Sequence, residues 1–312
     1  MSFSTASQLF AVVGAAVALK AASDLTSFVW FHFLSPPRYH RYLHGDAPYA
    51  LVTGATDGIG EAIAKELYSK GFNLIIHGRN PEKLRKVQDA ILSSPSPKKN
   101  NVRIWVADAS VAEIDFASAL KEWEDIEITL VIHNVGGAKL KGERFDAIPE
   151  ETLFSELHLN ATFPWLLTRA LLPKLRLARG PVELVFVGSV TADLSMPGLN
   201  PYGATKAFIK QLSGAIAADE QFRKPTNVTA SYLNVGGVST NNRGGPPSLF
   251  EPSAARFAKS VVAKVGSGRR VVVPWVWHAA QFWITGFVPE SVLMAGLADT
   301  TEKEIVAQDK RA

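Results

Sequence analysis

Thr53-Gly54-Ala55-Thr56-Asp57-Gly58-Ile59-Gly60 lies directly after a short apolar run, residues 49–52, and directly before a helical pattern, residues 61–70. A second apolar run at 72–77 completes a β-α-β unit. A strand that turns into a helix within a few residues needs glycine, and a Cβ there would keep the backbone away from a pyrophosphate at the helix N-terminus. This context predicts a dinucleotide-binding turn; a glycine-rich loop without a ligand is the alternative. The predicted binding residues are Gly54, Asp57, Gly58, Ile59 and Gly60.

The rest of the chain alternates between helical and strand-like segments. Helical patterns occupy residues 81–93, 112–123, 150–178, 201–221 and 252–265, and they separate six or seven strand candidates. Such alternation implies a parallel sheet that is covered on both faces. We therefore expect an α/β fold of the Rossmann type, a doubly wound parallel sheet of about seven strands, preceded by a hydrophobic N-terminal helix.

Three polar residues form a spaced set in the second half of the chain. Ser189 follows the apolar strand 182–187 and lies thirteen residues before Tyr202, and Lys206 follows four residues later. An isolated tyrosine has a pKa of about 10, so it is a sluggish proton donor at neutral pH. Because Tyr202 and Lys206 share a helical face, the ammonium group would lower the pKa of the phenol. The alternative is an ordinary aromatic residue and an exposed charge.

Together these motifs resemble the short-chain dehydrogenase/reductase family, whose turn reads Thr-Gly-x-x-x-Gly-x-Gly and whose active site contains Ser and Tyr-x-x-x-Lys. The resemblance runs from about residue 49 to about residue 240. It implies hydride transfer between a nicotinamide and a carbonyl carbon, with Ser189 bonded to the carbonyl oxygen and Tyr202 as the proton donor. It implies a catalytic tetrad of Asn160, Ser189, Tyr202 and Lys206. It also implies cofactor contacts from Asp108, Asn134, Tyr202, Lys206, Val238 and Thr240.

Two positions depart from the family pattern. His133 replaces the first asparagine of an Asn-Asn-x-Gly element, and Val235 replaces the proline of a Pro-Gly-x-Val-x-Thr element. The second change leaves the path of the loop after residue 235 open. Residues 241–248, with two glycines and two prolines, are predicted to begin a mobile lid over the substrate.

The end of the second predicted strand bears on cofactor choice. An enzyme that uses NAD usually places a carboxylate there, whereas the 2′-phosphate of NADP needs a cation. Arg79 follows this strand, and no acidic residue occurs before Glu82. A guanidinium group can pair with phosphate in a fork, so NADP(H) is favoured. A solvated charge at the start of a helix is the alternative.

The composition indicates one catalytic domain with apolar additions. The chain has 312 residues, 47% of them hydrophobic, with a formal charge of +4. No basic stripe with interleaved aromatic residues occurs, so a nucleic-acid partner is not expected. The chain has no cysteine, so disulfides and cysteine-ligated metals are excluded, and no metal site is expected. We expect a membrane-anchor segment at 1–36 and an NADP-binding domain at 46–312.

The N-terminal region predicts membrane association. Residues 9–34 are mostly apolar, and their only charges are Lys20 and Asp24, which lie four apart and can pair on a helix. The length suffices to span a bilayer with some tilt. A cleavable signal peptide and a core or interfacial helix are the alternatives. Arg38 and Arg41 follow the segment, and basic flanks stay cytoplasmic, so the catalytic domain is expected to face the cytosol.

A second apolar stretch, residues 271–287, contains three tryptophans and no charged residue. It is expected either to contact lipid or an acyl group, or to pack on the sheet as the last part of the core. His278 within this stretch is expected to be structural or interfacial rather than a ligand.

The apolar N-terminal segment narrows the resemblance to the microsomal branch that contains very-long-chain 3-oxoacyl-CoA reductases and 17β-hydroxysteroid dehydrogenase type 12. That resemblance implies an NADPH-dependent reductase of a lipophilic carbonyl substrate, such as a 3-oxoacyl-CoA or a steroid, at the endoplasmic reticulum membrane. A homodimer is implied as well. Two alternatives stay open: a reductase that tailors a specialised metabolite, and a non-catalytic module that senses a cofactor or binds lipid.

Overall fold

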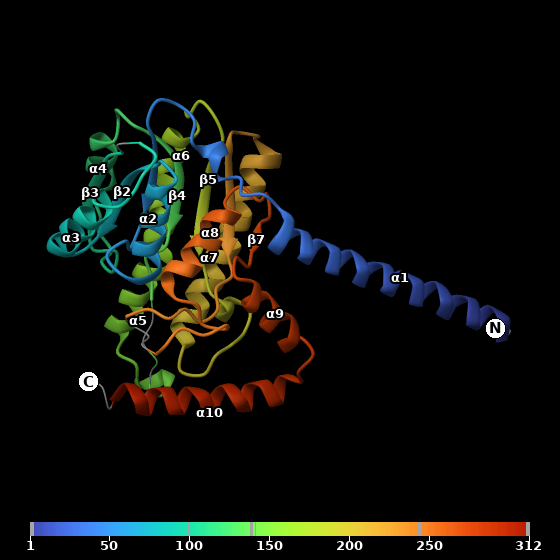
Figure 1. Cartoon of the computed structure of the whole chain (residues 1–312). Helices are drawn as coiled ribbons and strands as arrows, with labels where there is room; N and C mark the ends of the chain where they lie inside the picture. Colours follow the sequence, from blue (N-terminus) through green and yellow to red (C-terminus); the bar gives the residue numbers. More distant parts are fainter. Residues whose placement is uncertain (1–2, 99, 138–139, 141, 242–244, 310–312) are drawn as a thin grey trace. The chain divides into compact units, whose positions relative to one another are not determined.

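A computed structural model describes residues 3–98, 100–137, 140, 142–241 and 245–309. The chain divides into two compact units, Met1–Pro36 and Pro37–Ala312. The larger unit contains all of the predicted cofactor-binding and catalytic residues, which are colored from light blue to orange in Figure 1.

The larger unit is built on a seven-stranded parallel sheet, which confirms the predicted Rossmann-type fold (Figure 1). The strand order is β3-β2-β1-β4-β5-β6-β7, so the winding direction reverses between β1 and β4. In such sheets ligands bind outside the carboxyl ends of the strands, near this reversal. The strands are β1 (Pro48–Val52), β2 (Asn73–Gly78), β3 (Val102–Val106), β4 (Glu127–His133), β5 (Val182–Val187), β6 (Val228–Leu233) and β7 (Val271–Val272).

Helices cover both faces of this sheet. Every residue of β1, β2 and β5 is buried, which requires cover on each side because successive side chains point to opposite faces. Leu51, Val131 and Leu184 pack in one core cluster with side chains of α4, α6 and α7. The helices are α2 (Gly58–Ser69), α3 (Pro81–Leu92), α4 (Phe116–Glu122), α5 (Glu150–Leu157), α6 (Phe163–Leu175), α7 (Asn200–Ala218), α8 (Ala254–Lys264), α9 (Val276–Thr285) and α10 (Glu290–Asp309).

Polar residues at the helix starts explain where several helices begin. Asp57 accepts the Gly58 N–H at the start of α2, and Asn80 accepts the Lys83 N–H at the start of α3, where Pro81 is the first residue. These caps satisfy N–H groups that have no partner inside the helix. Helices α2 and α3 therefore begin directly after the turns that follow β1 and β2, and these turns carry predicted cofactor-binding residues.

The smaller unit is almost entirely helical. Helix α1 (Phe3–Val29) continues into a π-helical turn, Trp30–Leu34. Residues Ser7–Leu34 are long and apolar enough to cross a membrane, judged by length and composition. Lys20 and Asp24 form the predicted pair, with Nζ and Oδ2 2.8 Å apart. This pairing reduces the cost of placing two charges in an apolar phase.

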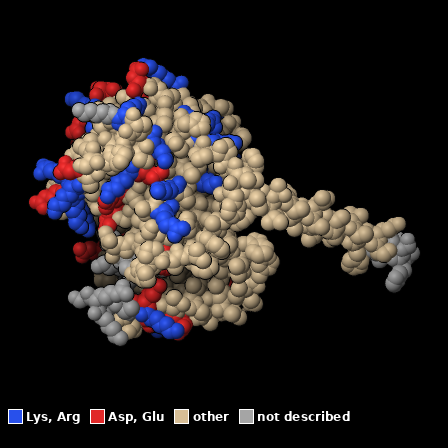
Figure 2. Space-filling view, in the orientation of Figure 1, with Lys and Arg blue, Asp and Glu red and all other residues tan. Residues whose placement is uncertain are grey.

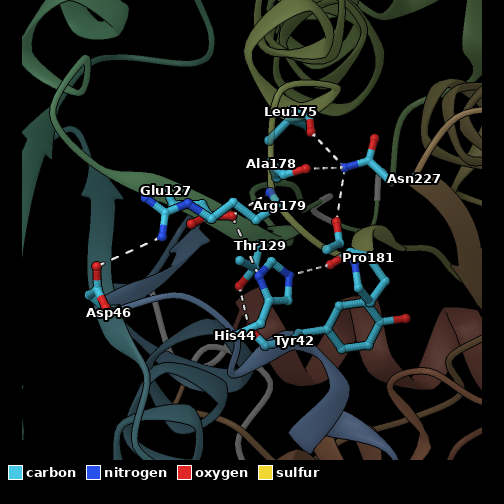
Figure 3. Close-up of polar contacts among 11 residues, drawn as sticks. Tyr42, His44, Asp46, Glu127, Thr129, Leu175, Ala178, Arg179, Pro181 and Asn227 are labelled. Carbon is cyan, nitrogen blue, oxygen red and sulfur yellow. Dashed lines mark hydrogen bonds and ion pairs between the residues drawn. The ribbon is translucent and has the colours of Figure 1, made fainter.

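A strap, residues 39–46, leads into β1 and, within the larger unit, packs against β4 and the segment before β5 (Figure 3). The Thr129 hydroxyl donates to the Tyr42 carbonyl at 2.7 Å. The His44 ring bonds the Pro181 carbonyl at 2.9 Å through Nε2 and lies 3.4 Å from Glu127 through Nδ1. The compact unit accordingly starts at Pro37, whereas the sequence places the start of the domain at 46.

The apolar stretch 271–287 forms both a strand of the sheet and a helix. Residues 271–272 form β7, the last strand of the sheet, and the following α9 buries His278 while it exposes Trp277 and Trp283. Part of the stretch therefore belongs to the core and part of it lies on the surface.

Candidate active site

A cavity of about 540 Å³ opens at the carboxyl edge of the sheet. Its walls come from the turns after β1, β2, β3, β4, β5 and β6, so the parallel arrangement gathers residues that are far apart in the sequence. Twelve of the predicted site residues line it: Gly54, Asp57, Gly58, Ile59, Arg79, Asp108, Asn134, Ser189, Tyr202, Lys206, Val238 and Thr240. Gly60 and Asn160 do not line it.

The glycine turn after β1 has the conformation that requires glycine. Gly54 and Gly58 have φ of +65° and +57°, which side chains disfavour. A methyl group at Gly60 would lie 2.2 Å from the Gly54 carbonyl oxygen. Gly60 therefore allows the turn to close against α2, although it does not reach the cavity. The open backbone of this turn, at the start of α2 and on the cavity wall, fits the pyrophosphate of a dinucleotide.

Asn134 and Thr53 join the turns after β4 and β1. The Asn134 amide donates to the Thr53 and Gly54 carbonyls at 3.0 and 3.1 Å. The Thr53 hydroxyl accepts the N–H groups of Asn134 and Val135, each at 3.0 Å. Asn134 thus holds the glycine turn in place while it lines the cavity. Thr53 is not among the predicted site residues, although it opens the motif in the sequence.

His133, the first departure from the family pattern, is a core residue. Its ring stacks on Phe186 and its Nε2 lies 2.9 Å from the Thr168 hydroxyl. Burial lowers its pKa to about 3, so the ring is neutral at physiological pH. The histidine therefore supports the end of β4 from inside the sheet, and Asn134 keeps its place in the turn.

Arg79 and Asp108 stand at the ends of β2 and β3, on one side of the cavity. Asp108 accepts the N–H and the hydroxyl of Ser110 at 2.9 and 2.7 Å. The hydrogen bond from the Ser110 hydroxyl is the largest cause that lowers the pKa of Asp108, and the positive charge of the nearby Arg79 also lowers it. Arg79 itself is exposed. A cation and an ionised carboxylate thus flank this end of the cavity.

His77 is a cavity residue that the sequence analysis did not select. Its ring packs against both Trp105 and Phe163, and its Nδ1 accepts the Gly54 N–H at 3.3 Å. Burial lowers the pKa of His77 to about 4, so this nitrogen is free to accept at neutral pH. A histidine at the end of a strand does not by itself predict a site residue. Its partner, the Gly54 N–H, comes from the neighbouring turn after β1.

The first two turns of α7 bring Tyr202 and Lys206 to the cavity wall, on one face of the helix as their spacing predicts. The Lys206 ammonium lies 5.5 Å from the centre of the Tyr202 ring and donates to the Val187 carbonyl at 2.9 Å. Burial lowers the pKa of Lys206 to about 8, so the side chain is still mostly charged at pH 7. A cation is thus held beside the phenol by the end of β5.

Asn160 occupies a π-helical turn, His158–Thr162, between α5 and α6. Such turns interrupt helices most often at functional sites. Its amide group bonds both the N–H and the carbonyl of Gly137, at 2.9 and 3.0 Å. A methyl group at Gly136 would lie 2.7 Å from Asn160 Oδ1 and 3.1 Å from Lys206 Nζ. The structure therefore brings the Asn160 amide and the Lys206 ammonium to the same position beside Gly136, where a side chain would displace them.

Ser189 follows β5 and is held by a tyrosine from the neighbouring strand. The Tyr232 hydroxyl accepts the Ser189 N–H at 2.8 Å and donates to the Ser189 carbonyl at 2.9 Å. A methyl group at Gly188 would lie 1.9 Å from the Tyr232 ring, so glycine is required there. Tyr232 is fully buried. No pattern in the sequence predicts this pair, because the two residues meet only across neighbouring strands of the sheet.

We expect Tyr232→Phe to lower kcat about tenfold while the dissociation constant of NADPH stays unchanged. The substitution leaves the buried N–H and carbonyl of Ser189 without their partner, at a cost of about 1–3 kcal/mol, and frees the serine to move. Steady-state kinetics, cofactor titration and thermal unfolding measure the three quantities. Tyr68→Phe, at a buried tyrosine in α2, is the control. A variant that loses stability but keeps kcat would show that Tyr232 has no positioning role.

The loop after β6 carries Val238 and Thr240 to the cavity despite the departure at Val235. The Val190 N–H donates to the Val235 carbonyl at 2.9 Å, and the Gly236 N–H donates to His278 at 3.3 Å. Val235 is buried. Of the predicted lid at 241–248, residues 242–244 lie outside the described part of the chain.

Comparisons with known proteins agree with this geometry. The sequence profile of the short chain dehydrogenase family matches residues 48–246. A very-long-chain 3-oxoacyl-CoA reductase-like protein of Arabidopsis thaliana is 31% identical over 271 residues, which cover 85% of this chain and 84% of the relative. The inactive hydroxysteroid dehydrogenase-like protein 1 of Homo sapiens is 27% identical and aligns with 78% of this chain and 72% of its own.

A solved structure shares the fold. The short-chain dehydrogenase of Sphingobium yanoikuyae, in complex with NADPH, superposes with a TM-score of 0.63 at 22% identity. The match covers 78% of this chain and 96% of that chain.

Proposed function

Because the chain belongs to the short-chain dehydrogenase family, we propose that it is an NADPH-dependent ketoreductase, or alcohol dehydrogenase in the reverse direction, that acts on a lipophilic carbonyl substrate. One observation carries the proposal. Ser189 from the turn after β5, and Tyr202 and Lys206 from α7, line the same cavity as the glycine turn after β1. Hydride transfer and proton transfer can therefore take place at one point.

The proposed chemistry assigns one role to each residue. Bound NADPH supplies the hydride. Ser189 donates a hydrogen bond to the carbonyl oxygen, and Tyr202 gives that oxygen its proton. The Lys206 ammonium stabilises the phenolate that remains on Tyr202, since its charge lies beside the ring. Asn160 holds the Gly137 backbone, and its amide lies near the Lys206 ammonium beside Gly136.

The charges at the far end of the cavity support NADP(H) over NAD(H). Arg79 lines the cavity directly after β2, where an NAD enzyme would need a carboxylate for the ribose. Gly54, Asp57, Gly58, Ile59 and Gly60 would form the pyrophosphate turn, and Asp108 would stand near the adenine. The NADPH complex of the Sphingobium relative is consistent with this choice.

The relatives support a lipophilic substrate. The Arabidopsis relative is named a very-long-chain 3-oxoacyl-CoA reductase-like protein, and the human relative a hydroxysteroid dehydrogenase-like protein. A 3-oxoacyl-CoA or a steroid is therefore the proposed substrate class. The human relative is described as inactive, but this chain keeps Asn160, Ser189, Tyr202 and Lys206.

The deciding experiment follows the loss of NADPH absorbance in the presence of the purified chain. The panel contains 3-oxoacyl-CoAs of increasing chain length, ketosteroids and small water-soluble ketones. The proposal expects the highest kcat/KM with a lipophilic member. A preference for small ketones would favour a reductase of specialised metabolites, and NADPH binding without turnover of any member would favour a sensing module.

The proposal includes attachment to the endoplasmic reticulum membrane through residues 1–36, with the catalytic domain on the cytosolic side. The apolar Ser7–Leu34 helix and the following Arg38 and Arg41 support it. We expect deletion of residues 2–35 to move the protein toward the soluble fraction while NADPH binding is preserved, because the deleted part lies outside the larger compact unit. Cell fractionation and cofactor titration measure both effects.

Deletion of residues 2–46 is the matched control. It also removes the strap, and thereby the partners of Thr129 and Pro181, so we expect this longer deletion to lose folded protein. Carbonate extraction of the full-length chain is the direct test of a spanning helix. Release of the intact chain into the supernatant would contradict it, and cleavage near residue 20 would identify a signal peptide.

A homodimer is the last part of the proposal. Trp165 of α6 and Phe208 of α7 are exposed and lie side by side, with ring centres 5.5 Å apart. Paired apolar side chains on a helical surface suit an isologous contact with a second copy. We expect Trp165→Glu to convert a dimer into a monomer, measured by light scattering in detergent. Leu177→Glu is the control at another exposed apolar residue. An unchanged mass for Trp165→Glu would contradict this interface.

A further inference from the structure

The outer side of α9 and the turn that follows it carry a group of exposed apolar side chains. Trp283 is 69% exposed, Ile284 54% and Phe287 71%. The Trp283 and Phe287 rings contact each other edge to face, with centres 4.8 Å apart. These three residues are called the α9 aromatic face. Single exposed apolar residues are ordinary on a protein surface, but adjacent large aromatic side chains indicate an interaction site.

The inner side of α9 is firmly attached to the larger unit. His278 is buried, and its ring bonds the Gly236 N–H and the carbonyls of Gly237 and Phe250 at 3.3, 2.9 and 3.0 Å. The Trp275 indole donates to the Leu249 carbonyl at 2.7 Å. Because the helix is fixed by its inner side, the aromatic face has a defined outward direction.

The segment that contains the α9 aromatic face has no charged side chain. Residues 271–289 contain no Lys, Arg, Asp or Glu. Figure 2 shows most of the charged side chains on other parts of this side of the molecule, whereas the surface around α9 is largely uncharged. A protein partner that binds an exposed surface usually meets a polar rim, whereas an uncharged aromatic surface suits the lipid interface.

The N-terminal helix of the chain indicates that a lipid bilayer is the apolar phase available to this face. Its Ser7–Leu34 helix has the length and composition to cross a bilayer. A catalytic unit tethered in this way spends its time beside a membrane, so the entropic cost of a second contact is largely removed. Trp and Phe are the side chains that favour the boundary between head groups and acyl chains.

We propose that the α9 aromatic face docks on the surface of a lipid bilayer. Trp283, Ile284 and Phe287 enter the boundary region, while the inner side of α9 stays on the protein. Since His278 links α9 to Gly236, and Gly236 lines the cavity, this contact places one wall of the active site close to lipid. A lipophilic substrate could then reach the cavity without crossing water. The docking rests on the membrane attachment of the proposed function, and this last consequence rests also on the proposed lipophilic substrate.

The absence of cysteine in the chain permits a clean test in the full-length protein. Phe287→Cys and Trp283→Cys would each be labelled with a thiol-reactive nitrobenzoxadiazole dye. The controls are Leu177→Cys, 83% exposed, and Leu92→Cys, 47% exposed, at apolar positions outside α9. Each labelled protein would be reconstituted into phosphatidylcholine vesicles with and without doxyl-labelled lipid. Binding of NADPH verifies that every variant is folded.

We expect the dye at residues 283 and 287 to shift to the blue and to lose most of its fluorescence to the doxyl lipid, while the dye at 92 and 177 does neither. Equal quenching at all four positions, or none at 283 and 287, would overturn the proposal. A blue shift without doxyl quenching would do the same, since it indicates a protein partner or a second copy. The result is independent of turnover and of carbonate extraction, so it can fail while the proposed function stands.

Discussion

Tyr202→Phe is expected to reduce turnover about 100-fold or more, because it removes the proton donor and leaves the cofactor turn untouched. The hydroxyl is the only group lost, and the Lys206 ammonium keeps its bond to the Val187 carbonyl. NADPH binding should therefore stay nearly intact. The measurements are kcat with the best substrate of the panel and the dissociation constant of NADPH by fluorescence titration.

Tyr39→Phe is the control for this substitution, because Tyr39 lies in the strap, far along the chain from the cavity residues. It should behave as the wild type in both measurements. Near-normal turnover in purified Tyr202→Phe would refute the assigned proton donor. Loss of NADPH binding together with turnover would instead assign Tyr202 a mainly structural role in the cavity.

Arg79→Asp is expected to shift the preference from NADPH toward NADH by about tenfold or more, since a charge-assisted hydrogen bond contributes about 1.5–3 kcal/mol. The new carboxylate would repel the 2′-phosphate and could accept a bond from the ribose of NADH. The measured quantity is the ratio of kcat/KM for the two cofactors at fixed ionic strength, because salt screens an exposed charge.

The control for this prediction is Arg85→Asp, an exposed arginine in α3 that does not line the cavity. It changes the net charge by the same amount but should leave the ratio unchanged. If Arg79→Asp also leaves the ratio unchanged, Arg79 is a surface charge and another residue must select the cofactor.

Local patterns in the sequence were sufficient for the fold and for much of the cavity. The glycine turn and the strand before it predicted the first β-α-β unit, because a positive φ, a buried strand and a helix start are all short-range properties. The spacing of Tyr202 and Lys206 placed both on one face of a helix for the same reason. The parallel sheet followed from the alternation of elements, which the strand order confirms.

The sequence by itself therefore determined which turns line the cavity and that they meet at one edge of the sheet. Only the tertiary structure decided what holds them there. Tyr232 reaches Ser189 from the neighbouring strand β6, and His278 reaches Gly236 from a helix near the end of the chain. No local pattern encodes such contacts, because each partner is defined by packing between segments that are distant in the sequence. The outward direction of Trp283 and Phe287 was likewise decided by the attachment of the opposite side of α9.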